Sequence, residues 1–477
     1  MTAPADALRS RIADRSARLA VVGLGYVGTP VACSFADAGF SVVGLDVAAD
    51  RVAAVSDGRP PFEGREPGLT EMLARVVAAG RLRATLEPRA LSGCDVVLVA
   101  VETPLDAATR RPAYAALRAA LETMGPRLAP GTLVVIESTL APGTTTGLVV
   151  PTLGRHAGAG AGAGLLVAHC PERVMPGRLL HNLAMMSRVV GGVTREAGEL
   201  AAELYRHIVK ADLDVTDALT AEIVKTAENA YRDVQIAFAN ELALLCESVG
   251  ADVWRVRELV NKSPGRAVLF PGAGVGGHCI PKDPWLLVAG AGPAFSASLV
   301  PAARAVNDGM PGHMAARVVR ALAARGLSPA EARIAVLGAS YLEDSDDDRN
   351  APTTALVAAL RGLGAEVRVH DPWVSAHRDL SVEACVTGVD AVVMMVAHAA
   401  YRGLDLSVLR PLARTPLLFD GRRVFDPEHA AAAGWLVHTL GVGRVDAPEP
   451  TAAEPLEAGP RESGPGRERP AGSRGDA

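Results

Sequence analysis

Runs of consecutive apolar residues recur along the first 200 positions and alternate with stretches of helical spacing. Continuous apolar runs are typical of strands buried on both faces of a sheet, and strands that alternate with helices indicate a parallel, doubly wound arrangement. The helices expected in this region cover Tyr26–Ala38 and Ala113–Leu128. The expected strands are RLAVVGLG (18–25), SVVGLD (41–46), CDVVLVAV (94–101), TLVVIES (132–138), LLVAHC (165–170) and SRVVGGV (187–193).

A long helical pattern follows from Asp217 to Val249. Apolar residues recur there at spacings of three and four, and neither Pro nor Gly interrupts the pattern before Gly250, which marks a helix end. About 33 residues at ~1.5 Å each extend ~50 Å, enough to bridge two domains and to form a dimer interface. A short helix is expected at Val253–Asn261, before a loop rich in Gly and Pro at 271–284.

A second α/β pattern begins at Arg333 and is shorter than the first. Its helix is expected at Thr353–Leu363, and its strands are RIAVLGAS (333–340), EVRVHDP (366–372), AVVMMVAH (391–398) and LLFDG (417–421). This pattern predicts a second, smaller nucleotide-binding domain. The expected fold class is therefore α/β, with two Rossmann-like doubly wound domains joined by a long central helix.

These patterns set the expected domain boundaries: an N-terminal extension (1–17), a first Rossmann domain (18–212), a central helical region (213–325), a C-terminal domain (326–445) and a tail (446–477). In residues 447–477, Gly and Pro make up 11 of 31 residues, and Leu456 is the only large apolar residue. So little apolar surface does not offset the entropy of ordering, which predicts that the tail is disordered.

Composition narrows the class of protein. Hydrophobic residues make up 49% and charged residues 21%, an ordinary globular mix, and the formal net charge of -5 argues against a nucleic-acid partner. No run of 18 apolar residues and no signal peptide is present, so we expect a cytoplasmic protein without membrane partners. The six cysteines are scattered without a CxxC pair, which argues against a disulfide framework or a metal cluster.

Residues 23–28, GLGYVG, fit the GxGxxG pattern, and they follow a strand and open a helix. Glycines there allow a tight turn close to a pyrophosphate, and the helix N-terminus offers free N–H groups. Asp46 ends the next strand, where its carboxylate would accept hydrogen bonds from a ribose and repel a 2′-phosphate. The pattern favours NAD over NADP; a structural turn that binds no nucleotide is the alternative.

Two further sets of residues are candidates for chemistry. Lys225 and Asn229 lie four residues apart on the long helix and share a face, although spacing alone leaves open a solvated polar patch. Cys279 lies in a glycine-rich segment close to Lys282 and Asp283, and reactive cysteines need such electropositive, partly exposed surroundings. Cys279 is therefore the candidate nucleophile, whereas His278 is more typical of a structural or surface residue.

An ordered series of motifs makes the chain similar to the UDP-glucose/GDP-mannose dehydrogenase family over about residues 18–445. The motifs are GLGYVG (23–28), ETP (102–104), EST and APGTT (137–145), CPERVMPG (170–177), KTAENAYRDVQIAFANELA (225–243), GVGGHCIPKD (274–283) and SDDDRNAP (345–352). CPERVMPG and NAYRDVQIAFANEL resemble the branch that acts on UDP-N-acetylhexosamines, especially N-acetylmannosamine, more than the UDP-glucose branch.

The resemblance implies an NAD-dependent, four-electron oxidation of a sugar C6 alcohol to a carboxylate. Cys279 would attack the C6 aldehyde to give a thiohemiacetal, which a second hydride transfer converts to a thioester that water cleaves. The resemblance further implies that Lys225 and Asn229 stabilise the oxyanion. Asp283 would help to activate water, Glu172 would act in thioester hydrolysis, and Thr139 would lie near the nicotinamide.

The resemblance also implies binding residues and partners. NAD would be bound in the first Rossmann domain by Gly23, Gly25, Tyr26, Val27, Gly28, Asp46, Arg51, Thr103 and Thr139. A UDP-sugar would be bound, mainly by the C-terminal domain, with contacts to Glu172, Arg173, Lys225, Asn229, Arg266, Gly276 and Arg349. Arg266 is the nearest candidate for an Arg that a neighbouring subunit often contributes in this family, although its spacing does not match cleanly. The central region would serve dimerisation and catalysis, giving a homodimer or a higher homo-oligomer.

Three positions depart from the family pattern. Leu342 stands where a Lys is common, Asn350 replaces the Glu that follows the motif Arg349, and Glu102 replaces a Gly or Pro near the cofactor pyrophosphate. The sequence leaves the sugar open between N-acetylmannosamine, N-acetylglucosamine and glucose. The cysteine loop and the second α/β domain argue against a two-electron hydroxyacid dehydrogenase. A non-catalytic nucleotide-sugar binder would be expected to have lost Cys279, which is present.

Overall fold

The first sheet of the computed structural model has eight strands in the order β3-β2-β1-β4-β5-β6-β7-β8. The structure describes residues 3–62, 64, 66–156, 164–173, 177–292 and 295–443. The strands are β1 (Arg18–Val22), β2 (Ser41–Leu45), β3 (Leu82–Thr85), β4 (Val96–Val99), β5 (Leu133–Ile136), β6 (Leu166–His169), β7 (Arg188–Gly192) and β8 (Leu213–Asp217). β3 and β8 lie outside the strands expected from the sequence.

Helices cover both faces of this sheet. Alternate residues of β1 enter two separate apolar clusters, with Leu19 and Val21 in one and Ala20 and Val22 in the other, as a doubly wound sheet requires. The α-helices are α1 (Ala3–Ala13), α2 (Gly28–Asp37), α3 (Ala49–Ser56), α4 (Leu69–Ala78), α5 (Ala115–Met124), α6 (Val150–His156), α7 (Leu179–Met185) and α8 (Arg195–Tyr205). Shorter turns are η1 (Pro88–Leu91), η2 (Gly125–Arg127) and the π-helical η3 (Thr145–Val149).

One pair of strands differs from the expected parallel arrangement. β7 runs antiparallel to β6, with Ala168 opposite Gly192, while every other neighbouring pair in the sheet is parallel. The expectation of parallel pairing is wrong at this point because the connection after β6 begins and ends at the same edge of the sheet. That connection therefore stays at the carboxyl edge, where it can supply side chains to a site.

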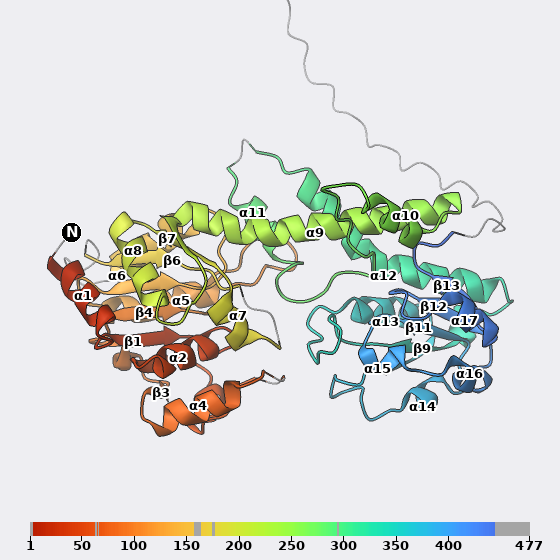
Figure 1. Cartoon of the computed structure of the whole chain (residues 1–477), viewed down its shortest axis with the longest axis horizontal. Coiled ribbons are helices and arrows are strands. Elements are labelled where there is room, and N and C mark those ends of the chain that lie inside the picture. Colours follow the sequence, from red (N-terminus) through yellow and green to blue (C-terminus); the bar gives the residue numbers. More distant parts are fainter. Residues whose placement is uncertain are drawn as a thin grey trace, which may run out of the picture. The chain divides into compact units, whose positions relative to one another are not determined.

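The long central helix is present as α9 (Ala218–Val249). Asp217 accepts a hydrogen bond from the Thr220 N–H at its start, and Gly250 ends it at φ 77°. α9 contacts β6, β7 and β8 and also packs along α12 (Leu299–Ala323), which the sequence patterns did not predict (Figure 1). Two shorter helices, α10 (Val253–Val260) and α11 (Asp283–Ala289), flank the loop that carries Cys279.

The second sheet has five parallel strands in the order β10-β9-β11-β12-β13. The strands are β9 (Arg333–Leu337), β10 (Glu366–His370), β11 (Ala391–Met394), β12 (Leu417–Asp420) and β13 (Leu436–Thr439). The helices are α13 (Pro352–Gly362), α14 (Val382–Val386), α15 (Ala399–Arg402), α16 (Leu406–Leu409) and α17 (Pro427–Ala432), with turns η4 (Pro329–Glu331) and η5 (Arg410–Leu412). Two Rossmann-like sheets and a central helix confirm the expected fold class.

Other expectations are outside what the structure tests. The tail expected at 446–477 lies wholly beyond the described residues, which end at Gly443. The domain boundaries stay predictions, because the chain up to Gly443 forms one compact unit. Among the described residues, no helix is both long enough and apolar enough to span a bilayer.

Candidate functional site

The GLGYVG segment forms a tight turn between β1 and α2. Gly23 has φ 95°, and a Cβ added at Gly28 would lie only 1.8 Å from the Gly23 carbonyl oxygen, so both positions require glycine. A Cβ added at Gly25 would meet nothing within 4 Å. The turn is therefore closed at its two ends and open at Gly25, in front of the N-terminus of α2. This geometry fits the pyrophosphate of a dinucleotide.

Asp46 follows β2 and reaches back to this turn. One carboxylate oxygen accepts the Leu24 N–H at 2.7 Å, and the other accepts the Ala48 N–H at 2.9 Å. Arg51 is the closest cation, with its guanidinium 3.7 Å from the carboxylate. Asp46 therefore shapes the turn as well as placing a negative charge where the ribose is expected. The neighbouring Val47, which the sequence patterns did not single out, is 98% exposed beside it.

Tyr26 connects the glycine turn to Arg349, which follows a strand of the second sheet. Its ring stacks on Phe62 with centroids 4.2 Å apart, and the Arg349 guanidinium lies 5.2 Å from the Tyr26 ring centroid. Burial raises the pKa of Tyr26 to about 12, with the charges of Glu66 and Asp347 adding to the effect. Val27 packs against the apolar cluster of the first sheet. A side chain of the expected cofactor turn thus touches one of the expected substrate residues.

Thr103 and Thr139 are brought together at the carboxyl edge of the first sheet. The Thr103 hydroxyl donates to the Thr139 carbonyl oxygen at 2.8 Å. The buried Lys282 ammonium donates to the Thr103 carbonyl oxygen at 3.3 Å and lies 3.4 Å from the Asp283 carboxylate. Lys282 was not among the residues expected at the site, although its place beside Cys279 in the sequence was a signal. Glu102 is exposed.

The residues expected to act on the sugar meet where α9 faces the start of α11. The Asn229 amide donates to the Asp283 carboxylate at 2.6 Å, and the Asp283 N–H donates to the Cys279 carbonyl oxygen at 2.9 Å. Lys225 lies one helical turn before Asn229, and its residue is 7% exposed. No described residue accepts a hydrogen bond from the Lys225 ammonium. Lys225 is therefore a buried cation that is available to bind an anionic oxygen.

Cys279 is the one exposed cysteine among the six, and the other five are buried. Protein atoms still crowd the thiol, so desolvation raises its pKa, as does the charge of Asp283; Lys225, Lys282 and Arg349 oppose the rise. Three cations around an accessible thiol suit a nucleophile whose product carries negative charge on oxygen. His278 is exposed at its surface, but desolvation by nearby protein atoms, followed by the charges of Lys282 and Arg349, lowers its pKa to about 4, which leaves that ring neutral at pH 7.

The cysteine loop, residues 271–282, also contacts the loop between β9 and α13, residues 338–351. The Gly277 N–H donates to the Arg349 carbonyl oxygen at 2.9 Å. A Cβ added at Gly276 would lie 2.5 Å from Cβ of Tyr341, so glycine is required for this approach. The Arg349 guanidinium forms two hydrogen bonds with the Asp347 carboxylate, at 2.8 and 2.6 Å.

No hydrogen bond or ion pair between described residues joins Glu172, Arg173 or Arg266 to this cluster. The Glu172 carboxylate is buried against the Arg188 guanidinium at 2.5 Å. Arg173 donates to the Ser187 carbonyl oxygen at 2.7 Å and also binds Glu228. Arg266 is exposed and donates to the Pro264 carbonyl oxygen within its own loop. Their catalytic and binding roles stay predictions.

A buried carboxylate on α9, Glu222, organises the APGTT segment and was not assigned a role from the sequence. It accepts the Gly143 N–H, the Thr145 N–H and the Thr145 hydroxyl, each at 2.6 Å. Glu222 is thus a fixed tie between α9 and the loop that follows Thr139. The signal in the sequence was a charged residue on a buried helical position, three residues before Lys225.

Arg422, just after β12, is a second residue that the sequence patterns did not single out. Burial lowers the pKa of its guanidinium, and Arg422 forms no ion pair among the described residues. A Cβ added at Gly272 would lie 2.3 Å from one guanidinium nitrogen, so Arg422 lies against the start of the cysteine loop. A partly buried cation that forms no ion pair among the described residues, at the carboxyl edge of a Rossmann-like sheet, suits an anionic ligand.

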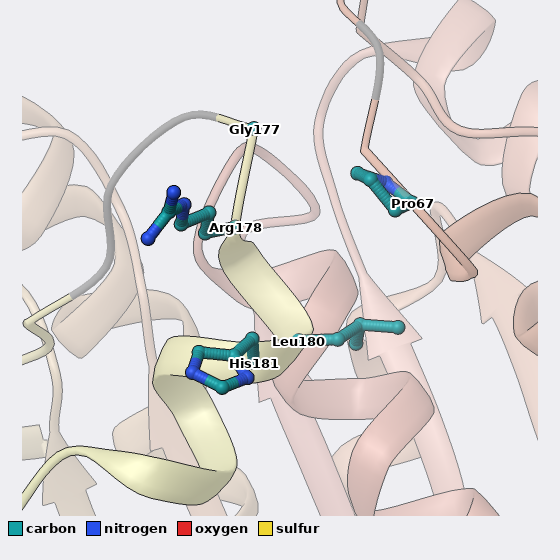
Figure 2. Close-up of a pocket in the computed structure, with 5 residues that line it drawn as sticks. All are labelled: Pro67, Gly177, Arg178, Leu180 and His181. Atoms are coloured by element: carbon teal, nitrogen blue, oxygen red, sulfur yellow. The ribbon is translucent and has the colours of Figure 1, made fainter.

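A hollow of about 340 Å³ lies elsewhere, beside the start of α7. Figure 2 shows that Pro67, Gly177, Arg178, Leu180 and His181 line it. Glu66 holds this region by accepting the Gly177 N–H at 2.6 Å and the Leu179 N–H at 3.1 Å. None of the expected site residues lines the hollow. In the described parts of the chain, no three His, Cys, Asp or Glu side chains gather in a way that could hold a metal ion.

Three family models match successive parts of the chain. They describe the UDP-glucose/GDP-mannose dehydrogenase family: its NAD binding domain at residues 17–209, its central domain at 219–309 and its UDP binding domain at 335–427. Together they cover most of the chain.

Similar proteins extend this result. The UDP-N-acetyl-D-mannosamine dehydrogenase of Pyrococcus horikoshii is 39% identical over 428 residues, which cover 90% of this chain and all of that protein. Its solved structure matches with a TM-score of 0.84 at 38% identity, over 90% of this chain and 100% of that chain. An NDP-N-acetyl-D-galactosaminuronic acid dehydrogenase of Ralstonia nicotianae is 37% identical, covering 87% of this chain and 97% of that protein. The structure of a UDP-glucose dehydrogenase from Pyrobaculum islandicum matches with a TM-score of 0.78 at 30% identity, covering 90% and 98%.

Proposed function

The chain belongs to the UDP-glucose/GDP-mannose dehydrogenase family, and from this premise we propose that it oxidises the C6 alcohol of a UDP-N-acetylhexosamine to a carboxylate through Cys279. The chain is an NAD-dependent nucleotide-sugar dehydrogenase. The observation that carries the cysteine mechanism is the cluster in which an exposed Cys279 meets Asp283, Asn229 and the cation of Lys225.

The proposed reaction has two oxidations with one covalent stage. The C6 alcohol first loses a hydride and a proton to become an aldehyde. The Cys279 sulfur then adds to the aldehyde carbon, and the oxygen takes a proton, giving a thiohemiacetal. Loss of a second hydride and proton gives a thioester, and water cleaves it to the carboxylic acid and the free thiol. NAD supplies the chemistry of hydride acceptance, once for each oxidation.

Residues of α9 and α11 support these steps. Lys225 stabilises the negative charge that develops on the C6 oxygen, because its ammonium is buried and has no acceptor of its own among the described residues. Asn229 orients the Asp283 carboxylate through their 2.6 Å hydrogen bond. Asp283 is then placed to accept a proton from the water that attacks the thioester. Thr139 lies at the cofactor side of the cluster through its contact with Thr103.

The cofactor end follows the geometry of the glycine turn. The open position at Gly25 and the N-terminus of α2 suit the pyrophosphate, and Asp46 suits an unmodified ribose. The diphosphate of the nucleotide sugar is assigned to the cationic end of the second sheet, where Arg422 lies partly buried without an ion pair among the described residues. Arg349 completes this end after leaving or sharing its contact with Asp347.

The sugar is proposed from the relatives. Proteins that are 39% and 37% identical are named for N-acetylmannosamine and N-acetylgalactosaminuronic acid substrates, and both match nearly the whole chain. A UDP-glucose dehydrogenase of known structure is 30% identical in sequence. The relatives therefore favour UDP-N-acetylmannosamine, the motif resemblance keeps UDP-N-acetylglucosamine beside it, and UDP-glucose is the alternative. Initial rates with these sugars and with their GDP counterparts rank the substrates directly.

The stoichiometry and Cys279→Ser test the mechanism. The unmodified enzyme should form two NADH per sugar and release a uronate with little free aldehyde. Cys279→Ser should lower kcat at least about a thousandfold, because a hydroxyl is a poorer nucleophile and an ester a poorer acyl donor than the sulfur counterparts. Cys246→Ser, a buried cysteine outside the cluster, is the matched control. One NADH per sugar, or full activity of Cys279→Ser, would exclude the covalent stage.

We also propose that α9 forms a homodimer interface. Tyr231, Phe238 and Leu245 are all more than half exposed and repeat every seven residues, which places them in one stripe along the helix. An apolar stripe of this length on one helix suits the same stripe of a second copy, because a two-fold interface pairs identical surfaces.

Phe238→Glu tests this interface by placing a charge in the middle of the stripe. We expect sedimentation velocity to show a monomer, or a dimer weakened about a hundredfold or more, since a buried unpaired charge is strongly unfavourable. Val408→Glu on α16 changes an equally exposed apolar residue away from α9 and should leave the assembly unchanged. An unchanged assembly in Phe238→Glu would overturn the α9 interface.

A further inference from the structure

The cysteine loop has little rigidity of its own. Gly274 and Gly277 have φ 133° and 86°, values that glycine adopts readily, and a third glycine, Gly276, lies between them. Glycine-rich backbone loses more conformational freedom on ordering than other sequences. A nucleophile two residues beyond Gly277 therefore depends on contacts from outside the loop to hold its position.

The β9–α13 loop supplies those contacts, and it binds both the N–H and the carbonyl oxygen of Gly277. The Gly277 N–H donates to the Arg349 carbonyl oxygen at 2.9 Å, and the Gly277 carbonyl oxygen accepts the Asn350 side-chain N–H at 3.1 Å. Both polar backbone groups of Gly277 are thus bound by two consecutive residues. A Cβ added at Gly277 would lie 2.8 Å from the Tyr341 ring, so packing closes the same contact.

Asn350 has a backbone conformation that suits its side chain. Its φ is 51°, in the left-handed region where Asn is favoured over most other residues apart from Gly. Its amide N–H can donate to a carbonyl oxygen, whereas an ionised Glu at this position would be an acceptor and would repel that oxygen. The replacement of the family Glu by Asn is therefore matched to the left-handed backbone and to the Gly277 carbonyl.

We propose that Asn350 is a positioning residue for Cys279, acting through the Gly277 peptide rather than on the substrate. Its hydrogen bond fixes the orientation of that peptide and so the approach of the thiol to the C6 carbon. Because Arg349 belongs to the same loop and contacts Tyr26 of the cofactor turn, this anchor joins the nucleophile to both binding ends. The effect on turnover rests on the proposed function, but the position of the thiol does not.

The experiment measures turnover and thiol reactivity in Asn350→Gly. Glycine keeps the positive φ without strain and removes only the side chain. We expect kcat to fall between about tenfold and about a hundredfold, with the KM for the UDP-sugar changed less than about threefold, as for a misplaced reacting group. The rate at which iodoacetamide alkylates Cys279 is measured without substrate, from the masses of the peptides. We expect this rate to rise severalfold because the freed loop exposes the thiol.

Two further variants complete the test. Asn350→Asp keeps the shape but removes the donor, so it should lower kcat in the same direction. Arg15→Gly, at another non-glycine residue with positive φ (64°), controls for added backbone freedom and should change neither kcat nor alkylation. Unchanged alkylation and kcat in Asn350→Gly would overturn the proposal. If the alkylation changes but the enzyme forms one NADH per sugar, the anchor stands and the proposed oxidation fails.

Discussion

The two sheets repeat one turn and put it to different uses. In the first sheet, Gly23 has φ 95° and donates its N–H to the Leu45 carbonyl oxygen at 2.8 Å. In the second, Gly338 has φ 99° and donates to the His370 carbonyl oxygen at the same distance. In both, the carboxylate that follows the neighbouring strand accepts the next N–H of the turn, at 2.7 Å for Asp46 and 2.6 Å for Asp371.

The turns differ in the length of chain between the glycine and the next helix. α2 begins at Gly28, five positions after Gly23, so its N-terminus faces the turn; α13 begins at Pro352, fourteen positions after Gly338. Pro352 also lacks the N–H that an anion would bind. The extra residues form the loop that carries Arg349 and Asn350. The longer connection of the second sheet thus forms a loop that contacts the cysteine loop, where the first sheet has a short turn in front of a helix N-terminus.

The two aspartates also differ, in the number of backbone N–H groups that each carboxylate accepts. Asp371 accepts four backbone N–H groups, from Ala339, Ser340, Trp373 and Val374, and contacts the buried His398 at 3.0 Å. Asp46 accepts two. A carboxylate whose acceptor sites are filled by its own fold is structural, and one with remaining capacity is suited to a ligand. An Asp at the same place in two similar turns can therefore be structural or suited to a ligand, depending on how many hydrogen-bond donors already surround it.

Asp371→Ala should have the largest effect on stability. It leaves four N–H groups and His398 without their buried partner, and we expect the free energy of unfolding to fall by about 3–5 kcal/mol. Burial opposes the charged form of Asp371, but hydrogen bonds from His398 and the backbone outweigh it and lower its pKa. This stabilisation is therefore present above the unfolded pKa and lost only as the pH falls through the lower folded value. Urea unfolding measures it; a loss equal to that of Asp46→Ala would contradict the contrast.

Glu137, after β5, sharpens the comparison because it is a buried carboxyl with few donors. Its partners are Tyr205, which donates to it, and the Arg188 guanidinium that it shares with Glu172. Burial first, and the charge of Glu172 second, raise its pKa to about 8. The folded state therefore holds a proton that the unfolded state releases above its ordinary value near 4.5.

Stability from Glu137 is then full below about pH 4.5 and is lost as the pH rises toward 8. Glu137→Gln, which is neutral at every pH, should flatten this dependence. We expect its stability relative to the unmodified protein to rise by about 2–4 kcal/mol between pH 5 and pH 8.5, as measured by urea unfolding across that range. A constant difference between the two proteins at all pH values would show that Glu137 is already ionised.

Asp46→Ala should change cofactor choice more than stability. Removing its charge relieves the repulsion of a 2′-phosphate, so the ratio of kcat/KM for NAD over NADP should fall about tenfold or more. Arg51, 3.7 Å away, is then free to bind that phosphate. The unmodified protein should prefer NAD. Equal use of NADP by the unmodified protein would show that Asp46 does not face the ribose.

Gly25→Ala should have the smallest effect on the fold. A Cβ there meets no protein atom within 4 Å, so the Tm should stay within about 2 °C, while the Kd for NAD rises about tenfold because the methyl group occupies the expected pyrophosphate position. Gly362→Ala, at an equally open glycine on α13, is the matched control and should leave NAD binding unchanged. Calorimetric titration with NAD measures the Kd of both variants, and thermal unfolding measures their Tm.

Much of the fold was predictable because its signals are local. The buried strands β1, β4, β5, β9 and β11 are continuous apolar runs, and α9 ends at the Gly250 that the spacing predicted. The strands that were missed, β3, β8 and β13, are partly exposed, so their apolar patterns are weak. The direction of β7 was missed because pairing depends on which edge a connection returns to, which residue patterns do not encode.

The sequence by itself determined the chemistry that depends on residue identity and order. The glycine turn with Asp46 and the candidate residues Cys279 and Lys225 are readable in the chain, since each needs its own residue type. Only the tertiary structure decided the long-range contacts. It buried Glu172 against Arg188, left Arg422 without an ion pair among the described residues and joined Asn350 to Gly277, 73 positions away in the chain. The physical reason is that burial and hydrogen bonding depend on neighbours in space, which arise from several elements at once.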